Sequence, residues 1–309
     1  MIAALQNTMK VGPTAALAAM LAALLLILAA PADTARAQKQ GDEKSGRIVF
    51  ASDRSTGNGV KNPEGDFEVF VMNPDGKKLV QLTENAVDDF DPTLSPDGHK
   101  IAFVSQNIQA SNPEGDAEIY TMNIEDSDGR NLTNNGGSVN ERDPHFSPDD
   151  QQIAFTSFGT QPSNPEGDFE VYWMNVDGSD QQNLTNTSGT ISDFDAAISP
   201  DGQRIAYVSA GARASNPEGE DEIYAMNALD GSDQKNLTNT AAGVQDDFPD
   251  YSPDGKKIAY DSDGDQPSNR EGNDEVYLMN ADGSRQQNLT GTGSNVNDVT
   301  PDLGSAEKN

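Results

Sequence analysis

Residues 95–105, Ser-Pro-Asp-Gly-His-Lys-Ile-Ala-Phe-Val-Ser, decide the fold because the chain repeats their pattern at a nearly constant interval. Equivalent segments begin at Ser147, Ser199 and Ser252. A second pattern, Glu followed by Val or Ile and then by Phe or Tyr, recurs in the same phase. Its glutamates are Glu68, Glu118, Glu170, Glu222 and Glu275, which are separated by 50, 52, 52 and 53 residues. A fixed period of this length is the signature of a repeat architecture.

Each repeat predicts four short strands, which in the second copy span 91–94, 101–105, 118–122 and 131–133. These runs are rich in β-branched and aromatic residues and are bounded by Gly, Pro, Asn and Asp, as strands usually are. Asp-Gly pairs between the third and fourth strands supply the positive φ that tight hairpins need. No segment after Ala37 shows a helical period.

Repeats of four antiparallel strands predict an all-β fold, a five-bladed β-propeller over 46–304 built from five repeats of about 52 residues. The first repeat begins at its second strand, 47–50, whereas 299–303 resembles a first strand with no second. We therefore expect the C-terminal strand to pair with the N-terminal blade and close the ring, which removes exposed sheet edges. A tail, 305–309, follows.

The N-terminus has the pattern of a secretory signal peptide over residues 1–37, followed by a short linker, 38–46. Lys10 precedes an uncharged run rich in Ala and Leu at 15–30, and Ala35-Arg36-Ala37 matches a cleavage site. The apolar run is shorter than the ~20 residues of a membrane span. We expect cleavage near Ala37, a periplasmic or secreted protein, and no transmembrane segment in the mature chain.

Charge and composition exclude several classes of protein. The chain has 51 Asp and Glu against 20 Lys and Arg, a net charge of −31, two His and no Cys. The absence of Cys excludes disulfide scaffolds and thiolate metal sites. The charge repels phosphate, so we expect no nucleic-acid partner and favour a protein or cell-envelope component, preferably a basic one. We expect a monomer.

Acidic residues recur at two places that propeller topology brings to one face. One set precedes each innermost strand, and the other lies in the Asn-x-Glu-Gly loops between the second and third strands. The loops have two interpretations, turns stabilised by Asn and Gly or oxygen ligands for Ca²⁺. The candidate metal ligands, which also form a candidate partner-binding face, are Asp89, Glu141, Asp193, Asp246 and Asp298 at the innermost strands and Glu64, Glu114, Glu166, Glu218 and Glu271 in the loops.

The combination of Ser-Pro-Asp-Gly-x-x-Ile-Ala-Phe/Tyr-x-Ser, Glu-Ile-Tyr-x-Met-Asn and Asn-Leu-Thr resembles the WD-type repeat of TolB-like β-propellers. The resemblance implies a periplasmic docking protein, here with the propeller alone, because residues 38–46 are too few for the α/β domain that precedes it in TolB. We expect a non-enzymatic binding or scaffold protein that uses its acidic face, with calcium as a candidate ion. The alternative is a carbohydrate- or peptide-active enzyme with its site at the channel mouth.

Overall fold

The computed structural model describes residues 46–125, 128–189, 191–266, 268–291, 296–301 and 303. The chain divides into two units, Met1–Ala35 and Arg36–Asn309, and all described residues belong to the second. The predicted signal peptide, most of the predicted linker and the predicted tail lie outside the described residues.

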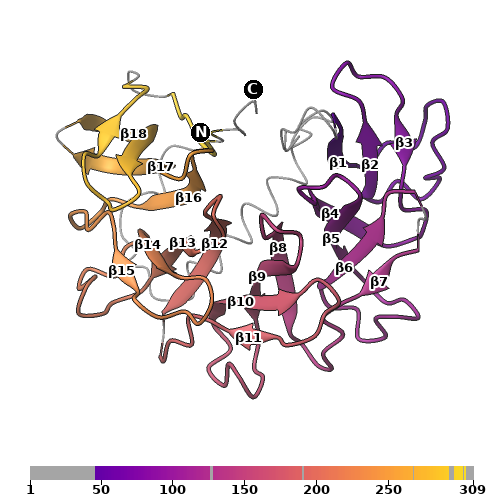
Figure 1. Ribbon diagram of the computed structural model, residues 1–309, viewed down its shortest axis with the longest axis horizontal. Coiled ribbons are helices and arrows are strands. Elements are labelled where there is room, and N and C mark those ends of the chain that lie inside the picture. The colour runs from indigo at the N-terminus through magenta and orange to yellow at the C-terminus, as the bar shows by residue number, and fades with distance from the viewer. Residues whose placement is uncertain are drawn as a thin grey trace, which may run out of the picture. The chain divides into compact units, whose positions relative to one another are not determined.

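The described residues form five antiparallel sheets that follow one another in chain order (Figure 1). Sheet 1 has three strands: β1 (Ile48–Ser52), β2 (Glu68–Met72) and β3 (Val80–Gln81). Sheet 2 has β4 (Asp88–Leu94), β5 (Lys100–Gln106), β6 (Glu118–Asn123) and β7 (Arg130–Asn131). Sheet 3 has β8 (Asn140–Phe146), β9 (Gln152–Phe158), β10 (Phe169–Asn175) and β11 (Gln182–Asn183). Sheet 4 has β12 (Ser192–Ile198), β13 (Arg204–Ala210), β14 (Glu222–Asn227) and β15 (Lys235–Asn236). Sheet 5 has β16 (Asp246–Tyr251), β17 (Lys257–Gln266), β18 (Asn269–Asn280) and β19 (Gln287–Asn288).

The Ser-Pro-Asp-Gly segments form the turns between the first two strands of a sheet. In sheet 2 the Ser95 hydroxyl accepts a hydrogen bond from the Lys100 N–H at 2.9 Å and donates one to Asp97 Oδ1 at 2.7 Å. Gly98 has a φ of 73°, which favours glycine. The same two contacts recur at Ser147, Ser199 and Ser252. The repeated segment, which ends in Asp150 instead of Gly in sheet 3, is therefore a turn that sets the register of the four-stranded sheets.

The innermost strand of each four-stranded sheet contains a β-bulge. In β4 the pairing with β5 shifts between Phe90 and Thr93, and Asp91 has a φ of 47°. Asp143, Asp195 and Phe248 have similar positive φ values at the equivalent positions of β8, β12 and β16. A bulge changes the direction of the side chains before it relative to those after it. It consequently decides where the acidic residues at the start of these strands lie.

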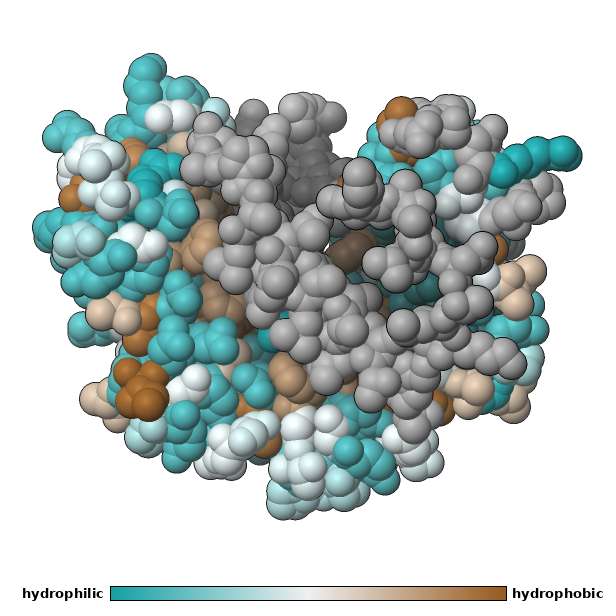
Figure 2. Space-filling model, turned by 180° about the vertical axis from the view of Figure 1, so that it is seen from behind, coloured by the Kyte–Doolittle hydropathy of each residue, from teal (hydrophilic) through white to brown (hydrophobic). Residues whose placement is uncertain are grey.

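The hydrophobic core lies between consecutive sheets. Ile119 of sheet 2 belongs to the same buried cluster as Ile153 and Tyr172 of sheet 3, and Val171 of sheet 3 joins Ile205 in sheet 4. Each sheet therefore depends on its neighbours for burial, as propeller blades do. On the surface seen in Figure 2, hydrophilic residues predominate and hydrophobic ones are scattered.

The C-terminal segment begins like an innermost strand. The Asp298 N–H donates to the Asp274 carbonyl oxygen at 2.9 Å, as the Asp246 N–H donates to that of Asp221. Thr300 has a φ of 53°, which matches the bulge position. Among the described residues, however, this segment forms no strand, and β1 pairs only with β2. Closure of the ring and the number of blades stay predictions.

The contact between sheets predicts a difference between two glycine substitutions. Gly231 and Gly76 both have positive φ, at 67° and 75°. A Cβ at Gly231 would lie 2.0 Å from the Leu184 carbonyl oxygen in sheet 3, whereas one at Gly76 would meet nothing within 4 Å. In urea unfolding, Gly76→Ala should cost about 1 kcal/mol and Gly231→Ala about 3 kcal/mol, because only the latter separates two sheets. Equal losses would contradict this packing.

Candidate functional site

A pair of acidic residues recurs at each junction, the boundary between two consecutive sheets. One member lies in β2, β6, β10, β14 or β18, and at four junctions the other lies near the start of the first strand of the next sheet. In the fifth pair the second member, Asp298, lies in the C-terminal segment, which forms no strand among the described residues. The pairs are Glu68 and Asp89, Glu118 and Glu141, Glu170 and Asp193, Glu222 and Asp246, and Glu275 and Asp298. Except for the half-buried Asp298, all of them are at most 2% exposed.

Backbone contacts between the sheets hold these residues in place. The Asp89 N–H donates to the Phe67 carbonyl oxygen at 2.7 Å, and the Glu141 N–H donates to that of Ala117 at 2.8 Å. Within sheet 2, Asp89 pairs with Ser105, which in turn pairs with Glu118. The acidic residues therefore lie at one end of the sheets, and the Ser-Pro-Asp-Gly turns lie at the other.

The repeated Leu-Thr pair supplies a hydroxyl to the glutamate. Thr133 Oγ1 accepts a hydrogen bond from the Ile119 N–H at 3.0 Å and donates one to Glu118. Thr185, Thr238 and Thr290 make the same donation to the glutamates of their sheets. The sequence pattern identified these glutamates only as strand residues. Their constant separation of 15 or 16 residues from a Thr was the signal that could have identified this contact.

Burial raises the pKa of these carboxyl groups. At junction 2/3, the boundary between sheets 2 and 3, burial raises the pKa of Glu118 to about 9, and the negative charge of Glu141 adds to the shift. Burial also raises the pKa of Glu141 to about 7, although hydrogen bonds from Asn135 and Ser157 oppose the change. Glu141 Oε2 and Asp89 Oδ1 are buried with no hydrogen-bond partner among the described residues. These two oxygens can accept a proton or a cation.

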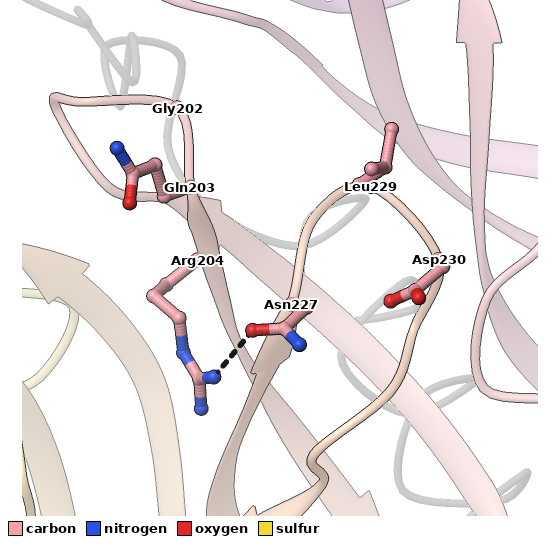
Figure 3. Close-up of a pocket in the computed structure, with 6 residues that line it drawn as sticks. All are labelled: Gly202, Gln203, Arg204, Asn227, Leu229 and Asp230. Atoms are coloured by element: carbon pink, nitrogen blue, oxygen red, sulfur yellow. Dashed lines mark hydrogen bonds between the residues drawn. The ribbon is translucent and has the colours of Figure 1, made fainter.

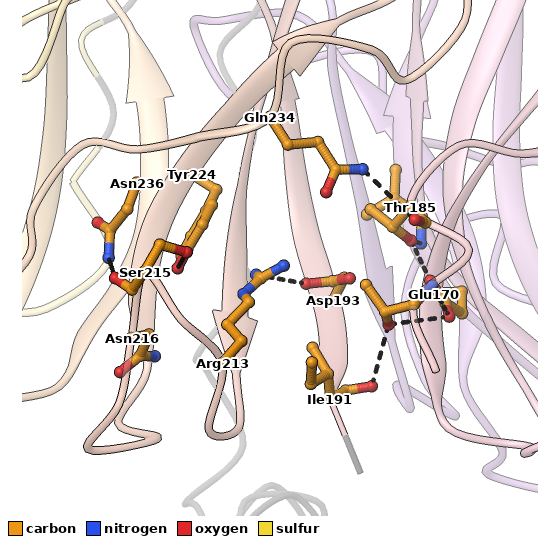
Figure 4. A network of polar contacts seen from close by, with 12 residues as sticks. Glu170, Thr185, Ile191, Asp193, Arg213, Ser215, Asn216, Tyr224, Gln234 and Asn236 are labelled. Carbon is orange, nitrogen blue, oxygen red and sulfur yellow. Dashed lines mark hydrogen bonds and ion pairs between the residues drawn. The ribbon is translucent and has the colours of Figure 1, made fainter. Parts of the chain in front are cut away.

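Junction 3/4 contains a cation from the chain itself (Figure 4). A guanidinium nitrogen of Arg213 lies 3.4 Å from Asp193 Oδ1, and the guanidinium lies 3.9 Å from the centre of the Tyr224 ring. At the equivalent positions of sheets 2 and 3, Gln109 and Gln161 donate to Ser105 and Ser157 at 2.8 and 2.9 Å. Arg213 thus provides a positive charge where these two sheets carry an amide.

The Asn-x-Glu-Gly loops follow the turn interpretation as far as their Asn residues are concerned. Asn112 Nδ2 donates to the Asp116 carbonyl oxygen at 2.6 Å, and its Oδ1 accepts from the Gly115 N–H at 2.9 Å. Asn62, Asn164, Asn216 and Asn269 make the same two contacts. Asn62, Asn112, Asn164, Asn216 and Asn269 are therefore structural residues.

The structure separates the two sets of predicted metal ligands. The loop residues Glu64, Glu114, Glu166 and Glu218 are exposed, whereas Asp89, Glu141, Asp193 and Asp246 are at most 1% exposed. The side chain of Glu271 lies outside the described residues. Within the described residues no group of three or more His, Asp or Glu side chains is arranged to hold a metal ion. Metal binding by these residues stays a prediction.

A pocket of about 310 Å³ lies at the opposite end of sheet 4 (Figure 3). Gly202, Asn227 and Leu229 line it, and Arg204 donates to Asn227 Oδ1 at 2.7 Å and pairs with Asp233 at 2.8 Å. The arginine is thus already neutralised, and the pocket adds no acid–base pair to the carboxyl groups at the other end.

No helix in the described residues has the length and hydropathy to cross a membrane.

Comparison with known proteins gives matches over part of the chain, and no protein-family model matches. A TolB homolog of Chlorobium luteolum is 29% identical over 171 residues, which are 55% of this chain and 33% of that protein. A TolB homolog of Chlorobium chlorochromatii is 28% identical over 49% of this chain and 30% of its own length. The matches span about a third of the length of these relatives.

Solved structures resemble the fold more extensively. A putative TolB from Agrobacterium tumefaciens has a TM-score of 0.58 and 20% identity, covering 84% of this chain and 81% of that one. An oligogalacturonate lyase from Vibrio parahaemolyticus has a TM-score of 0.56 and 15% identity, covering 82% of this chain and 64% of the lyase. The comparisons support a TolB-like β-propeller fold. Because an enzyme shares this fold, the fold alone does not decide between binding and catalysis.

Stability should decrease as the pH rises, because the pKa values of Glu118 and Glu141 are raised above that of free glutamate, about 4.3. Their contribution is fully present below about pH 4 and is lost as the pH rises through their folded-state pKa values of about 7 and 9. Glu118→Gln keeps a neutral hydrogen-bonding group, so it should raise the melting temperature at about pH 8 by a few degrees and change little at about pH 5. Glu114→Gln, on an exposed loop, is the control. A lower melting temperature for Glu118→Gln at about pH 8 would contradict the account.

Arg213→Gln should have the opposite effect at junction 3/4. It leaves the Asp193 carboxylate buried without its cation, so the free energy of unfolding at about pH 8 should fall by about 2 kcal/mol. The loss should shrink at about pH 5, because Asp193, with a pKa that burial raises to about 6, is then mostly protonated. The control is Arg204→Gln, which breaks an exposed pair in the same sheet. Equal effects of the two substitutions would show that Arg213 does not neutralise a buried charge.

Proposed function

We propose that this chain is an extracytoplasmic, non-enzymatic binding or scaffold protein that docks a basic partner through its acidic loops. The observation that carries the proposal is the recurrence of an exposed glutamate at the same place in the loops of sheets 1 to 4: Glu64, Glu114, Glu166 and Glu218. Asn62, Asn112, Asn164 and Asn216, which brace the same loops, are buried. Rigid loops that present one charged side chain each suit recognition better than catalysis.

The location follows from two independent expectations. The predicted signal peptide directs the chain out of the cytoplasm, and the resemblance to TolB-like propellers implies a periplasmic protein. The TolB homologs among its relatives are compatible with such a role. We propose a monomer in the periplasm or the surrounding medium.

The partner is a protein or envelope component with clustered Lys or Arg. With a net charge of −31, the chain attracts cationic surfaces over distances set by the ionic strength. At physiological salt the screening length is about 8 Å, so only charges close to the loops contribute to docking. Binding should therefore weaken steeply as salt increases.

Calcium is the proposed ion for the buried junctions. Asp89, Glu141 and Asp246 each have a buried carboxylate oxygen without a hydrogen-bond partner in the described residues, whereas Asp193 already pairs with Arg213. Ca²⁺ binds carboxylate, amide and hydroxyl oxygens with irregular geometry, and side chains of all three kinds meet at junction 2/3, where Asn135 and Ser157 contact Glu141. In this proposal calcium replaces the proton that the junction otherwise holds and stiffens the platform for docking.

The docking proposal is tested with two variants that remove equal charge from opposite ends of the sheets. The loop variant is Glu64→Gln/Glu114→Gln/Glu166→Gln/Glu218→Gln, and the control is Asp75→Asn/Asp177→Asn/Asp230→Asn/Asp282→Asn in the Asp-Gly turns. Purified mature protein is immobilised, and binding of envelope proteins from the source cells is quantified by mass spectrometry. We expect the wild type and the control to retain a basic protein. The loop variant should bind at least tenfold less of that protein, which corresponds to about 1.4 kcal/mol. Equal retention by all three, or equal loss in both variants, would contradict docking through the loops.

A further inference from the structure

Junction 4/5 differs from the other junctions at three positions of the repeat. Asp221 replaces a residue that is apolar in sheets 1 to 3, and Asp261 replaces one that is β-branched in sheets 2 to 4. Asp247 replaces a residue that is aromatic or Arg in sheets 2 to 4. The equivalents are Phe67, Ala117 and Phe169 for Asp221, Phe90, Arg142 and Phe194 for Asp247, and Val104, Thr156 and Val208 for Asp261. Three acidic replacements therefore coincide at one junction.

The preceding junction shows what these positions normally do. Phe169 of sheet 3 meets Phe194 of sheet 4 edge-to-face, with 6.2 Å between the ring centres. Phe194 pairs in register with Val208, which is fully buried. At junction 3/4 the three positions therefore make an apolar contact that holds the sheets together.

The same backbone geometry makes Asp221, Asp247 and Asp261 neighbours at junction 4/5. The Asp246 N–H donates to the Asp221 carbonyl oxygen at 2.9 Å, so Asp221 lies beside the start of β16. Asp247 pairs in register with Asp261 on β17. Side chains directly opposite on antiparallel strands point to the same face with Cβ atoms about 5 Å apart, and like charges there are destabilising. The chain has replaced an attractive contact with a repulsive one.

Burial makes the repulsion more costly. Asp261 is 6% exposed, and its Oδ1 has no hydrogen-bond partner among the described residues. Burial raises the pKa of Asp261 to about 7, with the charges of Asp274 and Asp263 adding to the shift. Burial also raises the pKa of the half-buried Asp247, and among the neighbouring charges that of Asp221 contributes most. An isolated buried carboxylate normally requires a counter-charge.

We propose that Asp221, Asp247 and Asp261 form a specific binding site for a divalent cation between sheets 4 and 5. An oxygen-only set of ligands without His or Cys suits Ca²⁺ rather than Zn²⁺. Because no three acidic side chains of the described residues form a ready-made metal site, binding must draw these three together. The site is distinct from the repeated carboxyl pairs and from the docking loops, and it does not depend on the proposed function.

The proposal is tested by giving junction 4/5 the residues found at junction 3/4. The variant Asp221→Phe/Asp247→Phe/Asp261→Val copies the residues of junction 3/4. Calcium binding to the full mature protein is measured by isothermal titration calorimetry at about pH 7.5, together with melting temperatures in calcium and in chelator. A second variant, Asp247→Asn/Asp261→Asn, keeps the side-chain sizes and guards against a folding failure of the first. Glu114→Gln/Glu166→Gln is a control that removes two exposed charges.

We expect the wild type and the control to bind calcium at this site, with a melting temperature about 5 °C or more higher at 100 times the dissociation constant. Both junction 4/5 variants should lose one bound calcium per chain, and in chelator the Asn variant should melt at or above the wild type. If the Asn variant binds as many calcium ions as the wild type, the proposal is overturned. If the calcium ion is lost in Asp89→Asn/Glu141→Gln instead, it belongs to the repeated carboxyl pairs. A wild type that binds no calcium would overturn the site and leave the docking proposal intact.

Discussion

Consecutive sheets meet at buried carboxyl groups whose pKa values are raised by burial. The four junctions between sheets 1 to 5 each bring together a buried glutamate from one sheet and a buried acidic residue from the next. The backbone N–H groups and the Thr hydroxyls lower the cost of burial, but two negative charges in such a place require a proton or a cation. The packing of the whole repeat array is therefore tied to the protonation and ion content of its junctions.

The strands and turns could be predicted from the sequence because each is determined locally. The Ser-Pro-Asp-Gly turn contains its own hydrogen bonds, as Ser95 and Asp97 show, and the 2-residue period of residues such as Ile101 and Phe103 defines a strand without reference to other sheets. The existence of repeated four-stranded sheets was consequently predictable. Pairing between the first and last strands depends on residues separated by the whole length of the chain, and it stays a prediction.

The environment of the acidic residues could not be predicted in the same way. Asp89 was expected on a face that binds a metal or a partner, yet it is fully buried. Its position depends on the bulge at Asp91, where a positive φ interrupts the alternation of side chains. Sequence periodicity does not reveal such a bulge, because Asp at this position gives the same pattern whether it lies in a regular strand or a bulged one. The exposed Glu114 and the buried Glu118 likewise differ only through the turn that Asn112 forms.

Variation among repeats is informative because the repeats share one backbone. Arg213 places a cation at a junction where other sheets have Gln109 and Gln161, and Asp247 introduces charge where Phe194 packs. Both changes alter the electrostatic balance of a junction, and the repeated four-stranded sheet is kept.

Infrared spectroscopy of the native protein at neutral pH in chelator tests the central claim most directly, because neutral carboxylic acids and carboxylates absorb at different frequencies. We expect a band from neutral carboxylic acids that is present in the folded protein and disappears on unfolding in urea at the same pH. A native spectrum with carboxylate bands alone would show that the junctions hold their charges without protons and would contradict the account.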